Sequence, residues 1–196
     1  MTNSMSNVEF VKALIIQHVR PHVIDIIDQH QIGFEVDQNE IHLLLLALKN
    51  AGWIQMSYLS AIDWPGENKF EVVYVLFNWD KPVYVQLRTK IDRTNPVIDS
   101  IIQIYPGAKY YERECHEFFG IAFPGNPDHH KQLILEQWDD IPPLRKDFDP
   151  KAYSDRKFPQ RTYTEDYSLS NSESTKVEKR KLRKQRAESL KGGKKQ

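Results

Sequence analysis

The sequence predicts an α+β fold: a two-layer sandwich of helices on a small, mostly antiparallel sheet, followed by an extended C-terminal segment. Two observations support this class. Apolar residues recur at helical spacing over residues 8–29 and again over residues 39–50. From Trp53 the apolar period changes to two, through three consecutive segments joined by short turns. Helices flanking such a meander are typical of a two-layer sandwich.

The N-terminal third predicts helix, strand and helix. Pro21 lies in the middle of the first apolar pattern and should split or kink that helix, because proline cannot continue it. Residues 32–36 alternate apolar and polar side chains, which predicts a short strand. Asn39 is a candidate N-cap for the helix over residues 39–50, and its run of four leucines predicts burial on more than one side.

The middle of the chain predicts three strands over residues 53–63, 70–78 and 83–91, rich in Val, Tyr and Phe. Asn95 is then a candidate cap for a helix that has proline at its first position and runs to Tyr105.

The stretch from Tyr110 to Asp147 differs from the rest. Its first ten residues combine charges with aromatics, which predicts an amphipathic helix ended by Gly120. Prolines then impose an irregular path, and Pro142 with Pro143 predicts a stiff, extended approach to Arg145. A helix followed by such a charged ribbon suits a surface that lies on another protein.

Three regions follow: an α+β domain over residues 1–122, an extended partner-docking segment over residues 123–167, and a polar, basic tail over residues 168–196. Aromatic side chains of the second region are expected to dock rather than to stay exposed. They are Tyr153, Phe158, Tyr163 and Tyr167.

The formal net charge of zero conceals an acidic body and a basic tail. Residues 171–196 carry ten Lys or Arg and three Glu, so the tail is +7 and the rest of the chain is −7. The pattern predicts a linker over residues 168–175, a charged helix over residues 176–191 and disorder from Gly192. The tail is interpreted either as a solvated extension or as a binder of polyanions.

Composition excludes several kinds of site. The single cysteine, Cys115, cannot form an internal disulfide, and an iron–sulfur cluster needs about four thiolates. The longest apolar runs fall short of the ~20 residues of a membrane span. The N-terminus has neither a secretory signal core nor a clear mitochondrial targeting pattern.

No catalytic constellation stands out. Glu112 and His116 have the i, i+4 spacing of zinc ligands, but no second histidine follows at a matching offset. Cys115 and His116 are adjacent on a helix and point about 100° apart, so a packed thiol is favoured over a nucleophile. Phosphate-binding loops and serine-nucleophile motifs are absent from the sequence. We therefore expect no catalytic residue, cofactor or metal in this chain.

Short blocks in fixed order point to a family. They are YERE from Tyr111, FFGI from Phe118, a Gly-Asn-Pro-Asp turn from Gly125 and PLRKDF from Pro143. This series resembles the 30-kDa subunit of respiratory complex I, called NuoC in bacteria and NADH dehydrogenase subunit 9 where a mitochondrial genome encodes it. A looser resemblance begins at Leu59, with LSAIDW. The usual His of the turn is Asn126 here.

The resemblance implies a non-catalytic core subunit of the hydrophilic arm of proton-translocating NADH:ubiquinone oxidoreductase, bracing the quinone-reducing module. It implies docking on the hydrogenase-like large subunit (the 49-kDa type), on the matrix side of the mitochondrial inner membrane or the cytoplasmic side of a bacterial membrane. Partner subunits would carry the flavin and the clusters. Without a presequence, a mitochondrial subunit of this kind is expected to be encoded in the organelle. The implied interface residues are Tyr111, Glu112, Arg113, Glu114, Phe118, Phe119, Gly120, Pro127, Asp128, Pro143, Leu144, Arg145, Lys146, Asp147 and Phe148.

Two alternatives stay open: the equivalent subunit of a membrane-bound hydrogenase or chloroplast-type dehydrogenase, and a nucleic-acid-binding module that uses the basic tail, with nucleic acid the less favoured partner. For Arg145 the interface interpretation predicts a partner group on another subunit. Arg145→Ala should then change the stability of the isolated chain by no more than about 0.5 kcal/mol.

Overall fold

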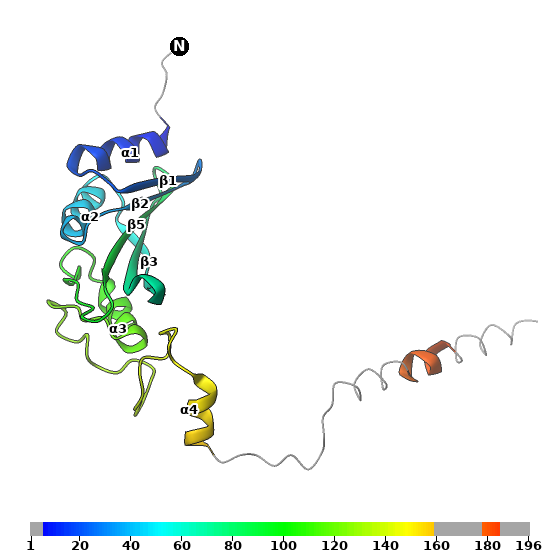
Figure 1. Ribbon diagram of the computed structural model, residues 1–196. Coiled ribbons are helices and arrows are strands. Elements are labelled where there is room, and N and C mark those ends of the chain that lie inside the picture. Colours follow the sequence, from blue (N-terminus) through cyan, green and yellow to red (C-terminus); the bar gives the residue numbers. More distant parts are fainter. Residues whose placement is uncertain (1–5, 159–177, 185–196) are drawn as a thin grey trace, which may run out of the picture. The chain divides into compact units, whose positions relative to one another are not determined.

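The computed structural model describes residues 6–158 and 178–184. Two compact units divide the chain, Met1–Tyr153 and Ser154–Gln196, and the sheet belongs to the first (Figure 1). In chain order the elements are α1 (Asn7–His18), β1 (Val23–Asp28), β2 (Gln31–Glu35), the 3₁₀ turn η1 (Gln38–Glu40), α2 (Ile41–Asn50), β3 (Gln55–Trp64), the 3₁₀ turn η2 (Pro65–Glu67), β4 (Lys69–Asn78), β5 (Val83–Asp92), α3 (Ala108–Phe119) and α4 (Pro150–Lys157).

The five strands form one mixed sheet in the order β1-β2-β5-β4-β3. The predicted meander is confirmed: β3 pairs antiparallel with β4, and β4 with β5. An antiparallel hairpin of β1 and β2 joins it through a parallel pairing of β2 with β5. The predicted α+β class with a mostly antiparallel sheet is therefore confirmed.

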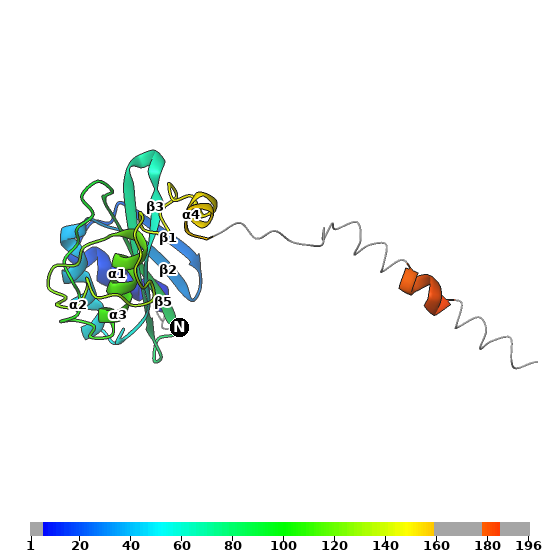
Figure 2. The ribbon, with the colours of Figure 1, turned by 90° about the horizontal axis from the view of Figure 1, so that it is seen from below.

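Helices cover one face of this sheet. Figures 1 and 2 both place α2 and α3 on the same side of the strands. Alternate side chains of β4 point into that layer and are buried, whereas those between them are mostly only partly buried. The buried set from β4 is Phe70, Val72, Tyr74 and Leu76. The core thus lies between the sheet and the helices.

The helix predicted over residues 8–29 is confirmed in its first half and wrong in its second half. Ser6 caps α1 through a capping box with Glu9, and the helix ends at His18, before Pro21. Residues 23–28, predicted to continue the helix, form β1 instead. This short, β-branched-rich segment gains backbone hydrogen bonds from β2, which outweigh its helical spacing.

The second helix is confirmed with a different start. Asp37, not Asn39, caps the chain through a capping box with Glu40, and η1 leads into α2. Leu44, Leu45 and Leu48 are buried, but Leu43 and Leu46 are about half exposed. The expectation that the leucine run is buried on more than one side is therefore wrong.

The helix predicted over residues 95–105 is absent, and the segment is irregular. Its backbone groups bond to tertiary partners instead. Ile98 and Ser100 donate their amides to carbonyls of Ala122 and Pro124, at 3.0 and 2.8 Å. Side chains of Gln38 and His42 donate to the carbonyls of Val97 and Ser100. These contacts replace the helical hydrogen bonds that local sequence would favour.

α3 matches its prediction and ends at Gly120, which adopts a left-handed φ of 80°. The approach to Arg145 is not extended, since the Arg145 amide donates to the carbonyl of Pro142 and closes a turn. Residues 123–153 belong to the same compact unit as the sheet.

The C-terminal region matches its predictions in part. Tyr153 stacks on Trp138 at 4.5 Å between ring centroids, so it docks within this chain, whereas Phe158 is exposed. Residues 178–184 are helical, inside the predicted helix over residues 176–191. Tyr163, Tyr167, the linker over residues 168–175, the segment from Gly192 and the boundary at residue 167 lie outside the described residues. In the described part of the chain, no helix has the length and apolar character to cross a membrane.

Candidate partner-docking surface

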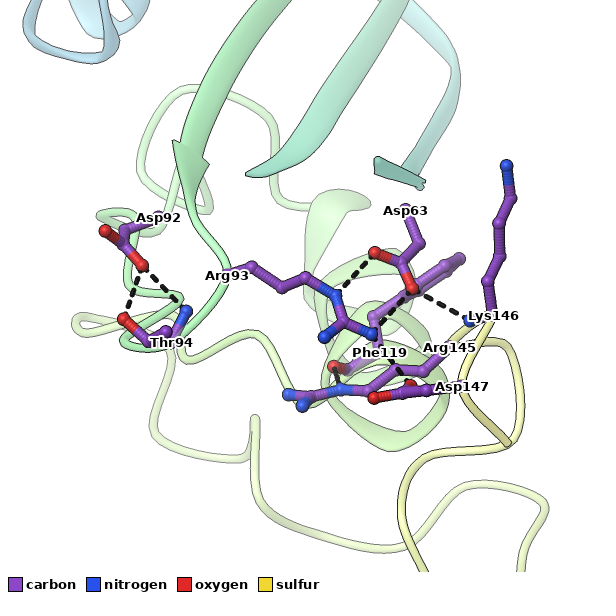
Figure 3. Close-up of polar contacts among 8 residues, drawn as sticks. All are labelled: Asp63, Asp92, Arg93, Thr94, Phe119, Arg145, Lys146 and Asp147. Atoms are coloured by element: carbon purple, nitrogen blue, oxygen red, sulfur yellow. Dashed lines mark hydrogen bonds and ion pairs between the residues drawn. The ribbon is translucent and has the colours of Figure 1, made fainter. Parts of the chain in front are cut away.

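A buried ion pair lies where β3 ends. Asp63 is 2% exposed and accepts two hydrogen bonds from Arg93, at 2.7 Å from Nε and 3.0 Å from Nη2 (Figure 3). Burial opposes ionisation, but hydrogen bonds from Arg93 and from the Lys146 amide hold the pKa of Asp63 below its ordinary value. The same pairing raises the pKa of Arg93. Asp63 is therefore a fixed negative charge inside the domain.

A ribbon of residues 141–148, here called the strap, binds to this pair. The amide of Lys146 donates to Asp63 Oδ2 at 2.8 Å, and Asp147 accepts from Arg93 Nη2 at 2.7 Å. The amide of Leu144 donates to the carbonyl of Phe118 at 3.0 Å. Figure 3 shows Asp63, Arg93 and Asp147 converging at one point beside α3. The strap is thus held on its own domain.

Arg145 caps the C-terminal end of α3. Its Nε donates to the carbonyl of Phe119 at 2.8 Å, one of the last carbonyls of the helix. Its guanidinium carbon also lies 5.3 Å from the centre of the Phe70 ring, within the range of a cation–π contact. The expectation that the isolated chain offers Arg145 no partner is therefore wrong, because helix end and strap meet within one domain.

Arg145→Ala is accordingly expected to lower the free energy of unfolding of the isolated chain by about 1–2 kcal/mol, since it removes a charge-assisted hydrogen bond and an aromatic contact. Arg145→Lys keeps the charge without the planar guanidinium and should cost less. Urea unfolding of the three proteins measures the difference. A loss below about 0.5 kcal/mol for Arg145→Ala would instead support a role at a partner interface alone.

Gly120 lets the strap approach α3. A Cβ at this position would lie 2.8 Å from Arg145 Nη2 and 3.2 Å from Pro142 Cγ, and its φ of 80° is unfavourable for any other residue. Gly120→Ala is expected to destabilise the chain by roughly 1–2 kcal/mol and to loosen the strap. Gly107→Ala is the matched control, since a Cβ there meets nothing within 4 Å. Thermal unfolding checks both, and equal melting temperatures would contradict the assigned role of Gly120.

Glu112 occupies the core rather than the surface. It is 0% exposed and accepts hydrogen bonds from the Ile101 amide at 2.8 Å, the Ser100 hydroxyl at 2.7 Å and Asn126 Nδ2 at 2.8 Å. Burial raises its pKa, and the three donors and the charge of His129 oppose that rise. The assignment of Glu112 to a partner interface is therefore wrong, because its carboxylate joins two loops of its own domain. Asn126 supplies one of those loops.

Two further charged side chains of α3 also bind residues of the same domain. Arg113 donates to the carbonyls of Lys131 and Gln132, at 3.2 and 2.6 Å. Glu117 accepts the amides of three successive residues, Leu133 to Leu135. The segment over residues 131–135, which follows the Gly-Asn-Pro-Asp turn, is thus held by α3 side chains. Lys109 and Lys131 lower the pKa of Asp128 in that turn to about 2.

The implied interface residues divide into three groups. Phe119, like Glu112, is buried in the core, so its assignment to a partner surface is also wrong. Partly buried are Tyr111, Arg113, Glu114, Phe118, Gly120, Asp128, Pro143, Arg145 and Phe148. Exposed are Pro127, Leu144, Lys146 and Asp147. Among the implied interface residues of the strap, Leu144 and Lys146 are therefore the ones that a partner can reach, because Asp147 is already paired.

Sequence reasoning missed Asp63 and Arg93 as site residues. Asp63 belongs to the LSAIDW block, so the family resemblance could have pointed to it. No motif of the sequence pointed to Arg93. Cys115 is a buried thiol whose pKa is raised by burial, so it is a packed side chain rather than a nucleophile. Among the residues described, no group of three or more His, Cys, Asp or Glu is arranged to hold a metal ion.

Comparisons with known proteins agree on one family. The profile described as "Respiratory-chain NADH dehydrogenase, 30 Kd subunit" matches residues 34–154. A subunit of the F(420)H(2) dehydrogenase of Methanosarcina mazei is 36% identical over 119 residues, which cover 57% of this chain and 68% of that protein. The mitochondrial NADH-ubiquinone oxidoreductase 30.4 kDa subunit of Neurospora crassa is 36% identical over 109 residues, covering 55% of this chain and 38% of that one.

A subunit of the NADH-quinone oxidoreductase of a Roseiflexus species is 40% identical over 90 residues, covering 45% of this chain and 51% of that protein. The chain thus matches about half the length of this relative, and less than half of the Neurospora protein. A chain from the membrane-bound sulfane sulfur reductase, an archaeal respiratory membrane complex, superposes with a TM-score of 0.73 and 29% identity, covering 81% of this chain and 95% of that one. A trypsin-resistant fragment of Nqo5 superposes with a TM-score of 0.53 at 20% identity, which shows the shared fold.

Proposed function

This chain belongs to the family of 30-kDa subunits of respiratory-chain NADH dehydrogenase, and from that premise we propose that it is a non-catalytic core subunit of a proton-translocating NADH:ubiquinone oxidoreductase. Its place is the hydrophilic arm, where it braces the quinone-reducing module. The observation that carries the proposal is the strap. A ribbon held by Asp63, Arg93 and Arg145 but exposing Leu144 and Lys146 is a preformed binding surface.

A preformed surface suits a bracing role. Because the strap is already ordered on its domain, docking has little conformational entropy left to lose. Such a contact holds two subunits in one geometry, which electron transfer to quinone requires. The partner we propose is the hydrogenase-like large subunit of the 49-kDa type. The site is the matrix side of the mitochondrial inner membrane, or the cytoplasmic side of a bacterial membrane if the source is bacterial.

A second candidate is the equivalent subunit of a related membrane complex that uses another electron donor. The 36% identity to an F(420)H(2) dehydrogenase subunit and the superposition on a sulfane sulfur reductase chain support it. Both candidates give the chain the same docking role and differ in its partners. No observation on the described residues favours a nucleic-acid-binding role for the basic tail, which stays a prediction.

Affinity purification of the full chain from its own membranes in mild detergent tests both candidates. The first predicts recovery of the complex I subunits, with NADH:ubiquinone reductase activity in the eluate. The second predicts a complex whose electron-input subunit does not use NADH. Recovery of the chain free of any redox complex would contradict both.

A further inference from the structure

The end of β3 presents different side chains on the two sheet faces. Asp63 points to the helix-covered face and is buried, whereas its neighbours Ile62 and Trp64 are 40% and 39% exposed. The Trp64 indole N–H donates to Glu71 at 2.9 Å, so the ring is held in place rather than free to rotate. An exposed, orientationally fixed Trp is the kind of residue that contributes most to protein interfaces.

Lys146 connects the strap to this outer surface. Its backbone amide is bound to Asp63 on the inner side, while its ammonium lies 5.5 Å from the centre of the Trp64 ring. Figure 3 shows the Lys146 side chain extending away from the cluster in which Arg93 and Asp147 meet. The strap therefore passes the end of β3 and places a cation over the indole face.

That cation has no acidic partner among residues 6–158 and 178–184, where it takes part in no salt bridge. Arg93, whose guanidinium lies beside the strap, is by contrast paired with two aspartates. Leu144, two residues earlier on the same strap, is 51% exposed. The surface therefore combines apolar groups with the positive charge of Lys146, which is not paired with a carboxylate of the described residues.

We propose that Ile62, Trp64, Leu144 and Lys146 form one binding surface for a partner protein that presents a carboxylate among apolar side chains. The carboxylate pairs with the Lys146 ammonium, and the apolar groups cover the indole and Leu144. The surface deepens the proposed docking function and rests on it. It spans the strap and the sheet edge, so the partner contacts both.

Two substitutions test the surface in the full chain, expressed in its own organism in place of the wild-type copy. Lys146→Glu reverses the charge but keeps the backbone amide that binds Asp63, so the fold is retained. Leu144→Asp adds a charge at the exposed apolar position and likewise keeps its amide. The matched controls are Arg20→Glu, an exposed cation between α1 and β1, and Ile54→Asp, an exposed apolar residue before β3.

Recovery of partner subunits per tagged chain is the first readout. We expect a drop of roughly tenfold or more for Lys146→Glu and Leu144→Asp, because like charges or an unpaired charge would be buried at the contact. Lys146→Arg and both controls should recover partners as the wild type does. Circular dichroism and the melting temperature of each purified chain verify that the fold is intact.

A zero-length carbodiimide cross-link is the second readout. In the assembled wild-type complex it should join Lys146 to an Asp or Glu of a partner subunit, identified by mass spectrometry, and Lys146→Arg should lose it. Wild-type recovery for the Lys146→Glu and Leu144→Asp variants, or a partner carboxylate linked to other lysines but not to Lys146, overturns this surface and leaves the docking function standing. Failure of the wild-type chain to recover any partner overturns the docking function itself.

Discussion

Asp63→Asn is expected to lower the free energy of unfolding by roughly 3 kcal/mol. The substitution keeps the size of the side chain but removes a charge that is almost fully buried. Asp147 would then be the only anionic partner of Arg93 at this site. The N–H₂ group of the new asparagine would face a hydrogen-bond donor of Arg93 or the amide of Lys146. Urea unfolding at neutral pH, monitored by circular dichroism, measures the loss.

The effect of Asp63→Asn should depend on pH. Because the pKa of Asp63 is lower in the folded chain than in the unfolded one, its stabilisation is present above an ordinary Asp pKa of about 3.9. It is lost as the pH falls through the folded pKa. The gap between wild type and variant should therefore shrink below about pH 4. An undiminished gap in acid would contradict the ion-pair explanation.

Asp92→Asn is the matched control for Asp63→Asn (Figure 3). Hydrogen bonds from Thr94 lower the pKa of Asp92, but the carboxylate is solvent-exposed. Its loss should therefore cost much less than the loss of Asp63. Equal costs would show that burial of the Asp63–Arg93 pair is not the source of the stability.

Glu112→Ala is the second large effect, with an expected loss of about 4 kcal/mol. Three buried donors, the Ile101 amide, the Ser100 hydroxyl and the Asn126 amide group, would lose their acceptor at once. The irregular segment over residues 97–105 should then become mobile, because the Glu112 carboxylate replaces helical hydrogen bonds there. Faster hydrogen exchange of the Ile101 amide, measured by NMR, would accompany the loss of stability.

Glu112→Gln is the matched control, since it keeps the volume and one acceptor oxygen, and it should cost only about 1–2 kcal/mol. Burial raises the pKa of Glu112 in the folded chain. The resulting contribution to stability is present below an ordinary Glu pKa, and it is lost as the pH rises through the pKa of the folded chain. Glu112→Gln should abolish that dependence, which is opposite in sign to that of Asp63. If Glu112→Gln were as unstable as Glu112→Ala, the loss of stability would come from the lost charge rather than from the lost hydrogen bonds.

The sequence by itself determined the elements whose local and tertiary preferences agree. Three period-two segments with turns between them specified β3, β4 and β5, because alternation commits one face of each strand to the core. The amphipathic pattern of α3 and the glycine after it specified that helix and its end. The ordered motifs from Tyr111 to Phe148 specified the family, since they are local strings whose meaning does not depend on knowing their contacts.

Only the tertiary structure decided where the motif side chains point. Glu112 and Arg145 carry the charges that usually mark a surface, yet one is buried among three donors and the other caps α3, because partners distant in sequence supply their hydrogen bonds. The segment over residues 23–28 became a strand because it pairs with β2 in a hairpin, and residues 97–105 lost their helix because their backbone groups bond to tertiary partners. In both cases, partners outside the segment satisfied backbone groups that local propensity would have paired otherwise.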